Sequence, residues 1–215
     1  MATKFVVVTG TDTGVGKTFV TCAIARSLSD RGVDVRAVKP IESGVDGHGP
    51  EDGKLLAAAA RQRWPTEALI RLKAPLAPPI AAELEAMLLD WDSIIESIQS
   101  IQADIVLVES AGGLLSPLTD TKSSVDLAHA LNAEILVVSV DRLGTLNHTL
   151  MTLRTVSAER RTCGGVIMCS PAQPDESTGQ NARLIARLGQ VDRVTSLPWL
   201  STYDEAARYF ADWYA

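Results

Sequence analysis

The segment from Val6 to Thr18 constrains the fold most strongly, because three consecutive valines lead into a glycine-rich turn that ends in Gly16-Lys17-Thr18. β-branched residues favour a strand, and residues 19–28 have the apolar spacing of a helix. A strand, a glycine-rich turn and a helix in this order predict a phosphate-binding loop. The alternative is an ordinary glycine-rich turn between a strand and a helix.

The residue types of this turn suit the phosphates of a nucleotide. Glycines let the backbone direct its N–H groups at phosphate oxygens, Lys17 can reach the β and γ phosphates, and the Thr18 hydroxyl can bind Mg²⁺. The positive end of the following helix dipole adds to the same anion site. We therefore expect nucleotide contacts from the loop and the first helical turn, namely Gly14, Val15, Gly16, Lys17, Thr18 and Phe19.

The loop also departs from the common pattern. Thr11 stands where the usual spacing has its first glycine, and Gly10 lies one position earlier. Partition ATPases, which are nucleotide-switched binding modules, carry a signature lysine where this chain has Asp12. That difference argues against a partition-type module, which we keep as the alternative function.

The composition is that of one globular domain, residues 1–215, with 46% hydrophobic residues. A formal net charge of −6 gives no general basis for binding nucleic acid or an anionic membrane. The three cysteines have no metal-ligand spacing, and no apolar stretch approaches the ~20 residues of a membrane span. We expect a cytoplasmic protein without an anchor.

Short apolar runs alternate with helical patterns along the chain. This alternation predicts an α/β fold of the P-loop NTPase type, with a mostly parallel sheet covered by helices on both faces. The predicted strands are residues 4–9, 33–38, 104–109, 134–140, 163–169 and 192–196. The predicted helices are residues 17–30, 53–63, 79–88, 91–102, 145–160, 177–189 and 203–213.

Polar residues follow several predicted strands at their carboxyl ends, where open α/β sheets bind ligands. Lys39 follows the second strand, so a second lysine is expected beside the phosphate loop, where it can neutralise a transferring phosphoryl group. A surface lysine is the alternative. Ser43 can hydrogen-bond a substrate or form a turn.

Glu109 ends an almost wholly apolar strand, where a carboxylate needs a cation. Mg²⁺ prefers hard oxygen ligands, and Thr18, Glu109 and a loop aspartate can supply them together with water and phosphate. Asp52 is our choice for that aspartate, although helix capping explains it equally well. Glu51 and Asp46 remain substitutes.

Two further segments are candidates for substrate binding. The sequence Ala111-Gly112-Gly113 predicts a second turn near the phosphates, where side chains would block a close approach. Asn147 and His148 open a predicted helix whose N-terminus can bind a carboxylate. A capping or packing role is the more common one for such a histidine.

These motifs together closely resemble dethiobiotin synthetase, nearly from end to end. The resemblance rests on residues 9–18, Lys39-Pro40 with Ser43-Gly44, Glu109 with residues 111–113, and the segment Leu143-Gly144-Thr145-Leu146-Asn147-His148. It implies an ATP-dependent ligase of biotin synthesis that closes a cyclic urea. Its substrates are 7,8-diaminononanoate (7,8-diaminopelargonate) and CO₂, which form a carbamate that takes the γ-phosphoryl group before the second amine displaces phosphate.

The resemblance also implies roles for individual residues. Lys17 and Lys39 stabilise the transferring phosphate, and Thr13 and Ser43 orient the diamine or carbamate. Metal ligands are Thr18, Asp52 and Glu109. Substrate contacts also come from Gly112 and Gly113, and from Leu146 and Asn147 across the interface of a homodimer.

Two departures from the family pattern concern the nucleotide site. Ser110 stands where glycine is usual, which puts an extra hydroxyl close to the phosphates or the metal. Cys169 and Ser170 stand where many members have Asn-Asp, and that asparagine reads the adenine base. We expect base recognition by backbone groups and a looser nucleotide choice that includes CTP. The expected nucleotide contacts outside the loop are Asp52, Glu109, Ser110, Ala111, Gly112, Cys169, Ser170, Pro198, Trp199, Leu200 and Glu205.

Overall fold

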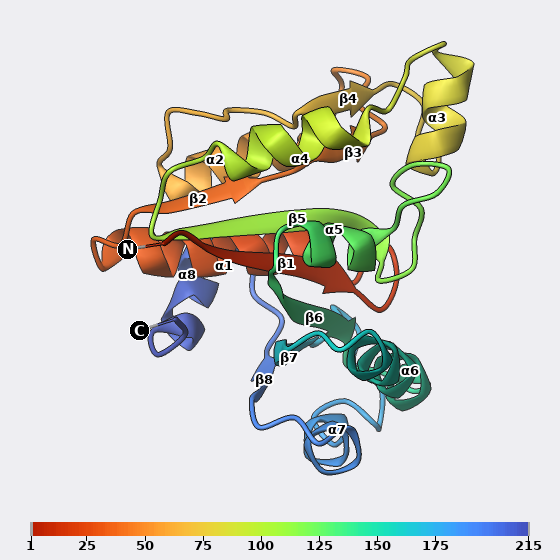
Figure 1. Ribbon diagram of the computed structural model, residues 1–215. Coiled ribbons are helices and arrows are strands. Elements are labelled where there is room, and N and C mark those ends of the chain that lie inside the picture. Colours follow the sequence, from red (N-terminus) through yellow and green to blue (C-terminus); the bar gives the residue numbers. More distant parts are fainter. Residues whose placement is uncertain (1, 215) are drawn as a thin grey trace.

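A six-stranded, wholly parallel sheet forms the centre of the protein in a computed structural model that describes residues 2–214 (Figure 1). The strand order is β2-β5-β1-β6-β7-β8, so the first strand lies inside the sheet. The bounds are β1 Lys4–Gly10, β2 Val35–Val38, β5 Ile105–Gly113, β6 Glu134–Val140, β7 Cys163–Cys169 and β8 Val194–Leu197. The predicted α/β fold with a parallel sheet is confirmed.

Helices cover both faces of this sheet. Successive side chains of a strand point to opposite faces, so the mostly apolar strands make both faces apolar and both must be covered. Val7 faces one apolar core, which it shares with helices α4, α5, α6 and α7. Val6 and Val8 face the other, which contains α1, α2 and the C-terminal helices. The bounds are α1 Lys17–Asp30, α2 Asp52–Ala60, α4 Trp91–Gln99, α5 Ser124–Ala130, α6 Thr145–Ala158, α7 Asn181–Gly189 and α8 Tyr203–Ala207, followed by the 3₁₀ turn Arg208–Phe210.

A second, two-stranded parallel sheet was not predicted from the sequence. It pairs β3 (Ile41–Ser43) with β4 (Ile70–Leu72) and lies beside α3 (Pro78–Leu84) (Figure 1). Strands of three residues are too short to show an alternating pattern. Helix α5 was also missed, although Ser123 and Asp126 form a capping box at its start.

The third predicted strand is longer than expected. Residues 111–113, which we expected to form a turn, continue β5, and Gly113 pairs with Gly10 of β1. The helix predicted over 203–213 is also wrong in length, since α8 ends at Ala207 and a 3₁₀ turn follows. Among the helices of residues 2–214, none combines the length and hydropathy that crossing a membrane requires.

Candidate active site

The strand order brings the candidate residues to one edge of the sheet. The phosphate loop follows β1, Glu109 lies in the neighbouring strand β5, and Lys39 follows β2 on the far side of β5. Parallel strands end at the same edge, so three segments that are distant in the sequence meet there. This arrangement agrees with the expectation that the polar strand ends gather around the loop.

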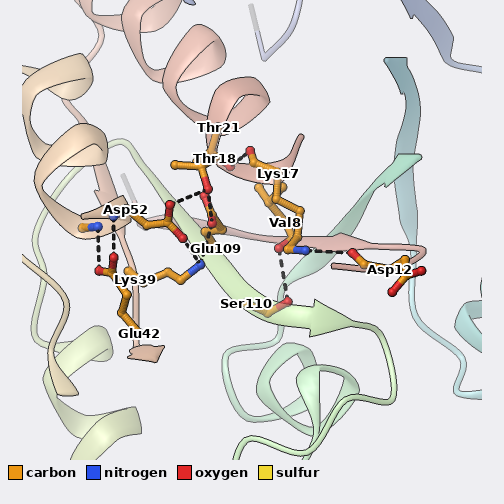
Figure 2. A network of polar contacts seen from close by, with 11 residues as sticks. Val8, Asp12, Lys17, Thr18, Thr21, Lys39, Glu42, Asp52, Glu109 and Ser110 are labelled. Carbon is orange, nitrogen blue, oxygen red and sulfur yellow. Dashed lines mark hydrogen bonds and ion pairs between the residues drawn. The ribbon is translucent and has the colours of Figure 1, made fainter. Parts of the chain in front are cut away.

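Lys39 lies at the centre of a compact polar network (Figure 2). Its Nζ donates to Glu109 Oε1 at 2.6 Å and to Asp52 Oδ2 at 2.7 Å. The Thr18 hydroxyl lies 2.9 Å from Asp52 Oδ1 and 2.9 Å from Glu109 Oε1. The alternative of a solvated surface lysine is therefore wrong, because Lys39 is only 5% exposed.

Burial and charge set the ionisation of this network. Burial lowers the pKa of Lys39, but the negative charges of Glu109 and Asp52 outweigh it and hold the pKa above its usual value. For Asp52 the effects are reversed. Burial raises its pKa, but the charge of Lys39 and the hydrogen bonds from Lys39 and Thr18 bring the pKa below its usual value. The buried network therefore keeps an ammonium beside carboxylates.

Lys17 has a different environment. Its Nζ donates to the Asp12 carbonyl oxygen at 2.9 Å, and the side chain is buried. The pKa of Lys17 is lowered from its usual 10.5 to about 8, chiefly by burial and also by the charge of Lys39, against the opposing effect of Glu109. Gly16 precedes α1 with φ 99°, a left-handed conformation that favours glycine. The first residue of α1 thus carries a poorly solvated amine that is folded back onto the loop backbone.

The structure distinguishes the three acidic residues that we considered for the metal. Asp52 reaches Thr18 and Lys39, whereas Glu51 pairs with Lys54 and Arg71, both at 2.8 Å. Asp46 accepts a hydrogen bond from the His48 backbone N–H. Asp52 also makes no capping bond in α2, so the capping interpretation does not account for it.

Thr18, Asp52 and Glu109 present oxygen ligands that can hold a divalent cation. Glu109 is fully buried, and its Oε2 has no hydrogen-bond partner among the described residues. Within residues 2–214, no group of three His, Cys, Asp or Glu side chains forms an all-protein metal site. Two carboxylates and a hydroxyl fit Mg²⁺, which takes its other ligands from phosphates and water.

Ser110 differs from the expectation. Its hydroxyl is fully buried and donates to the Val8 carbonyl oxygen at 3.3 Å, away from the network around Lys39 (Figure 2). The hydroxyl therefore bridges β5 and β1 instead of facing the phosphates or a metal. Ser110 lies within β5, so its side chain points to the face opposite that of Glu109.

The residues expected to orient the substrate lie on segments around the phosphate loop. Ser43 ends β3, and its buried hydroxyl has no partner among the described residues. Gly112 has φ +65°, and a Cβ atom there would lie 3.8 Å from Thr13 Oγ1. Thr13 itself is exposed. Gly112 and Gly113 of β5 thus lie beside the loop, as strand residues instead of the expected turn.

A cavity of about 240 Å³ separates the phosphate loop from the start of α6. It is lined by loop residues together with Arg142, Thr145, His148 and Pro171. Leu146 and Asn147 occupy the first turn of α6 and are not among the residues that line this cavity. Asn147 is exposed to solvent.

The residues expected near the nucleotide base follow the last two strands. Cys169 ends β7, and its side chain packs against Gly16, where a Cβ would lie 3.3 Å from the sulfur. Ser170 donates its backbone N–H to the Leu197 carbonyl oxygen, which joins the two strand ends. Residues 198–200 come directly after β8, and Glu205 lies in the first turn of α8, which packs on α1.

Comparisons with known proteins agree with this geometry. A family model described as an AAA domain matches residues 4–207. The "ATP-dependent dethiobiotin synthetase BioD" of an Anaeromyxobacter species is 37% identical over 207 residues, which cover 94% of this chain and 93% of the relative. The protein of the same name from Anaeromyxobacter dehalogenans is 39% identical over 197 residues, 89% of this chain and 88% of the relative.

Solved structures support the fold independently. The 54 kDa signal recognition particle protein of Aeropyrum pernix, in complex with GDP, aligns with a TM-score of 0.56 at 16% identity. The alignment covers 99% of this chain and 47% of that protein. At this identity the likeness concerns the nucleotide-binding fold alone. The sequence relatives match over nearly their whole length, and they show that the chain belongs to the ATP-dependent dethiobiotin synthetase family.

Proposed function

We propose that this protein forms dethiobiotin from 7,8-diaminononanoate, CO₂ and ATP. The reaction begins with a carbamate on one amine, whose oxygen attacks the γ phosphate of ATP and displaces ADP. The second amine then attacks the resulting mixed anhydride, phosphate leaves, and a cyclic urea closes. The observation that carries the proposal is the buried network of Lys39, Glu109, Asp52 and Thr18 beside the phosphate loop.

Two lysines address the main electrostatic difficulty of this reaction. A carbamate and a triphosphate are both anions, so their approach requires positive charge at the reacting oxygens. Lys17 reaches the β and γ phosphates from the loop. Lys39 is held charged by its carboxylate partners and lies at the adjoining strand end, where it can contact the carbamate and the transferred phosphoryl group.

We assign Mg²⁺ to Thr18, Asp52 and Glu109, where a bound cation offsets the phosphate charge. Substrate orientation belongs to Thr13, Ser43, Gly112 and Gly113, through hydroxyl and backbone N–H groups. The Ser43 hydroxyl supports this role, because it is buried without a partner among residues 2–214. An oxygen of the bound carbamate would accept a hydrogen bond from this hydroxyl.

Base recognition is assigned to backbone groups of residues 169–171 and 198–200, with Glu205 nearby. The Cys169 side chain has no carboxamide that can read adenine, and its thiol packs against the loop glycine Gly16. We therefore propose that CTP and other triphosphates also serve as co-substrates. Turnover with ATP alone, across a panel of nucleoside triphosphates, would contradict this part.

The active form is proposed to be a homodimer with a substrate site at the subunit interface. Asn147 supports this, because it is exposed in the first turn of α6 without lining the cavity of its own chain, whereas Leu146 in the same turn packs partly against the core. This turn of α6 is proposed to meet the carboxylate end of substrate bound to the partner. Light scattering on the active protein tests this, and a fully active monomer would rule it out. A cytoplasmic location stays a prediction.

Mass spectrometry of the products tests the reaction directly. Purified protein is incubated with 7,8-diaminononanoate, bicarbonate, Mg²⁺ and either ATP or CTP. We expect dethiobiotin from the parent protein and none from Lys39→Ala. Lys4→Ala is the matched control, because Lys4 begins β1 at the opposite end of the strand from the loop. Absence of product from the parent, despite nucleotide binding, would refute the proposed reaction.

A further inference from the structure

Glu42 lies next to the polar network and bonds the backbone of α2. Its buried carboxylate faces the N-terminus of α2, the helix that begins with Asp52 (Figure 2). We infer that Glu42 is a positioning residue that fixes the Asp52 carboxylate for metal binding by holding the first turn of α2. This inference rests on the proposed function, which makes Asp52 a ligand of Mg²⁺.

Glu42 supplies the acceptor that α2 otherwise lacks. Its Oε1 accepts from the Asp52 backbone N–H at 2.5 Å, and its Oε2 accepts from the Gly53 N–H at 3.0 Å. The first N–H groups of any helix need partners from outside it, and the N-cap residue Glu51 makes no side-chain cap. A carboxylate also interacts favourably with the positive end of the helix dipole. Glu42 thus holds the backbone of Asp52, whose side chain is the proposed metal ligand.

The connection between β3 and α2 explains why such an anchor is needed. Residues 44–51 join the two elements and include three glycines and a proline. Gly44 and Gly47 both have positive φ, so the segment follows an irregular path. A connection of this kind does not by itself define where a helix starts. The carboxylate of Glu42 ties the helix start directly to the small sheet.

A steric contact holds the same turn from another side. A Cβ on Gly53 would lie 2.2 Å from the backbone nitrogen of Ala68, so α2 rests directly on this backbone. With Gly53 against Ala68 and two N–H groups on Glu42, the first turn has little freedom to tilt. Asp52 needs that constraint, because its two oxygens bond different partners, Thr18 at 2.9 Å and Lys39 at 2.7 Å.

The contribution of Glu42 can be measured as metal affinity, apart from turnover. We would titrate Mn²⁺ into the protein with a non-hydrolysable ATP analogue and follow bound metal by electron paramagnetic resonance. Outer-shell partners of metal ligands typically alter affinity 10–100-fold, so we expect Glu42→Gln to weaken Mn²⁺ binding by about tenfold. Glu42→Asp keeps the negative charge at the start of α2 and is expected to lose less Mn²⁺ affinity than Glu42→Gln.

Asp90→Ala is the matched control, because Asp90 caps the N-terminus of α4 by accepting from the Ser93 N–H. This variant loses a helix cap of the same kind in an element that does not carry Asp52. We expect less than a twofold change in its Mn²⁺ affinity. Urea unfolding of all variants establishes that each one is folded under the conditions of the titration.

A double substitution separates positioning from general loosening. If Glu42 acts through Asp52, then adding Glu42→Gln to Asp52→Asn should weaken Mn²⁺ binding no further. Equal losses from Glu42→Gln and Asp90→Ala, or a full tenfold loss in the Asp52→Asn background, would overturn the inference. Dethiobiotin formation by the parent protein is measured separately, so a failure of the proposed reaction is distinguished from a failure of this positioning role.

Discussion

The lowered pKa of Lys17 predicts that ATP binding takes up protons in a defined pH range. Burial holds this pKa at about 8, so part of the population carries a neutral amine near that pH. Triphosphate oxygens placed beside the amine favour its charged form and raise the pKa. Binding therefore draws a proton from solvent wherever Lys17 is neutral beforehand.

The size of the effect follows from the titration curve. With a pKa of about 8, about half of the Lys17 side chains are neutral at pH 8, about a tenth at pH 7 and about nine-tenths at pH 9. If the bound nucleotide restores the charge completely, ATP binding takes up about 0.5 proton at pH 8. The uptake then falls to about 0.1 at pH 7 and approaches 0.9 at pH 9.

Isothermal titration calorimetry in buffers of different ionisation enthalpy measures this uptake. ATP and Mg²⁺ are added without diamine, so that no turnover contributes heat. Lys17→Met is the control variant, because its side chain has comparable length and no titrating group. Uptake that stays constant from pH 7 to 9, or that persists unchanged in Lys17→Met, would refute the argument that burial of this lysine sets its charge.

Three predictions concern the stability of the protein. The folded-state pKa of Lys17 lies below 10.5, so the unfolded chain binds its proton more tightly, and the free energy of unfolding should rise by up to about 3 kcal/mol between pH 8 and 10.5 relative to Lys17→Met. Parallel pH curves for the two proteins in urea unfolding would contradict this. Lys39→Met leaves Glu109 fully buried without its cation and should cost about 3–5 kcal/mol, most of which adding Glu109→Gln should restore. A double variant no more stable than the single one, by the same assay, would count against this account. Gly53→Ala should destabilise by about 1–3 kcal/mol despite the better helix propensity of alanine, because the Cβ clashes with the Ala68 backbone. A rise in melting temperature would show that α2 can move away freely.

Much of the candidate site could be predicted from the sequence, because the phosphate-loop motif locates one part and the parallel sheet locates the residues that gather around it. The phosphate loop is local, and its residues follow one another in the chain. Lys39 and Glu109 are 70 residues apart, but both lie at carboxyl ends of predicted parallel strands. A parallel sheet brings such ends together whatever the intervening sequence. Both residues were therefore expected near the phosphate loop, whereas the ion pair between Lys39 and Glu109 was not predicted.

Ser110 and Glu42 show where this reasoning stops. The predicted strand ended at Glu109, and the resemblance put the Ser110 hydroxyl close to the phosphates or the metal. In the structure β5 continues, and alternation along the strand turns Ser110 toward the Val8 carbonyl. Glu42 lies in a strand of three residues, and its partners are backbone N–H groups of α2. Every residue except proline has the same backbone N–H, so the residue types of α2 do not reveal this contact, and it could not be predicted.

The inner position of β1 also has a consequence for synthesis of the chain. This strand is made well before β5 and β6, its two partners within residues 2–214, which begin at Ile105 and Glu134. A nascent chain therefore carries the apolar run of β1 unpaired until its distant neighbours exist. Non-local parallel pairing is also slow to form, and exposed apolar strands invite aggregation. The loop at the end of β1 is thus made before the strands that support it, so nucleotide cannot assist folding of this site until β5 and β6 have been synthesised.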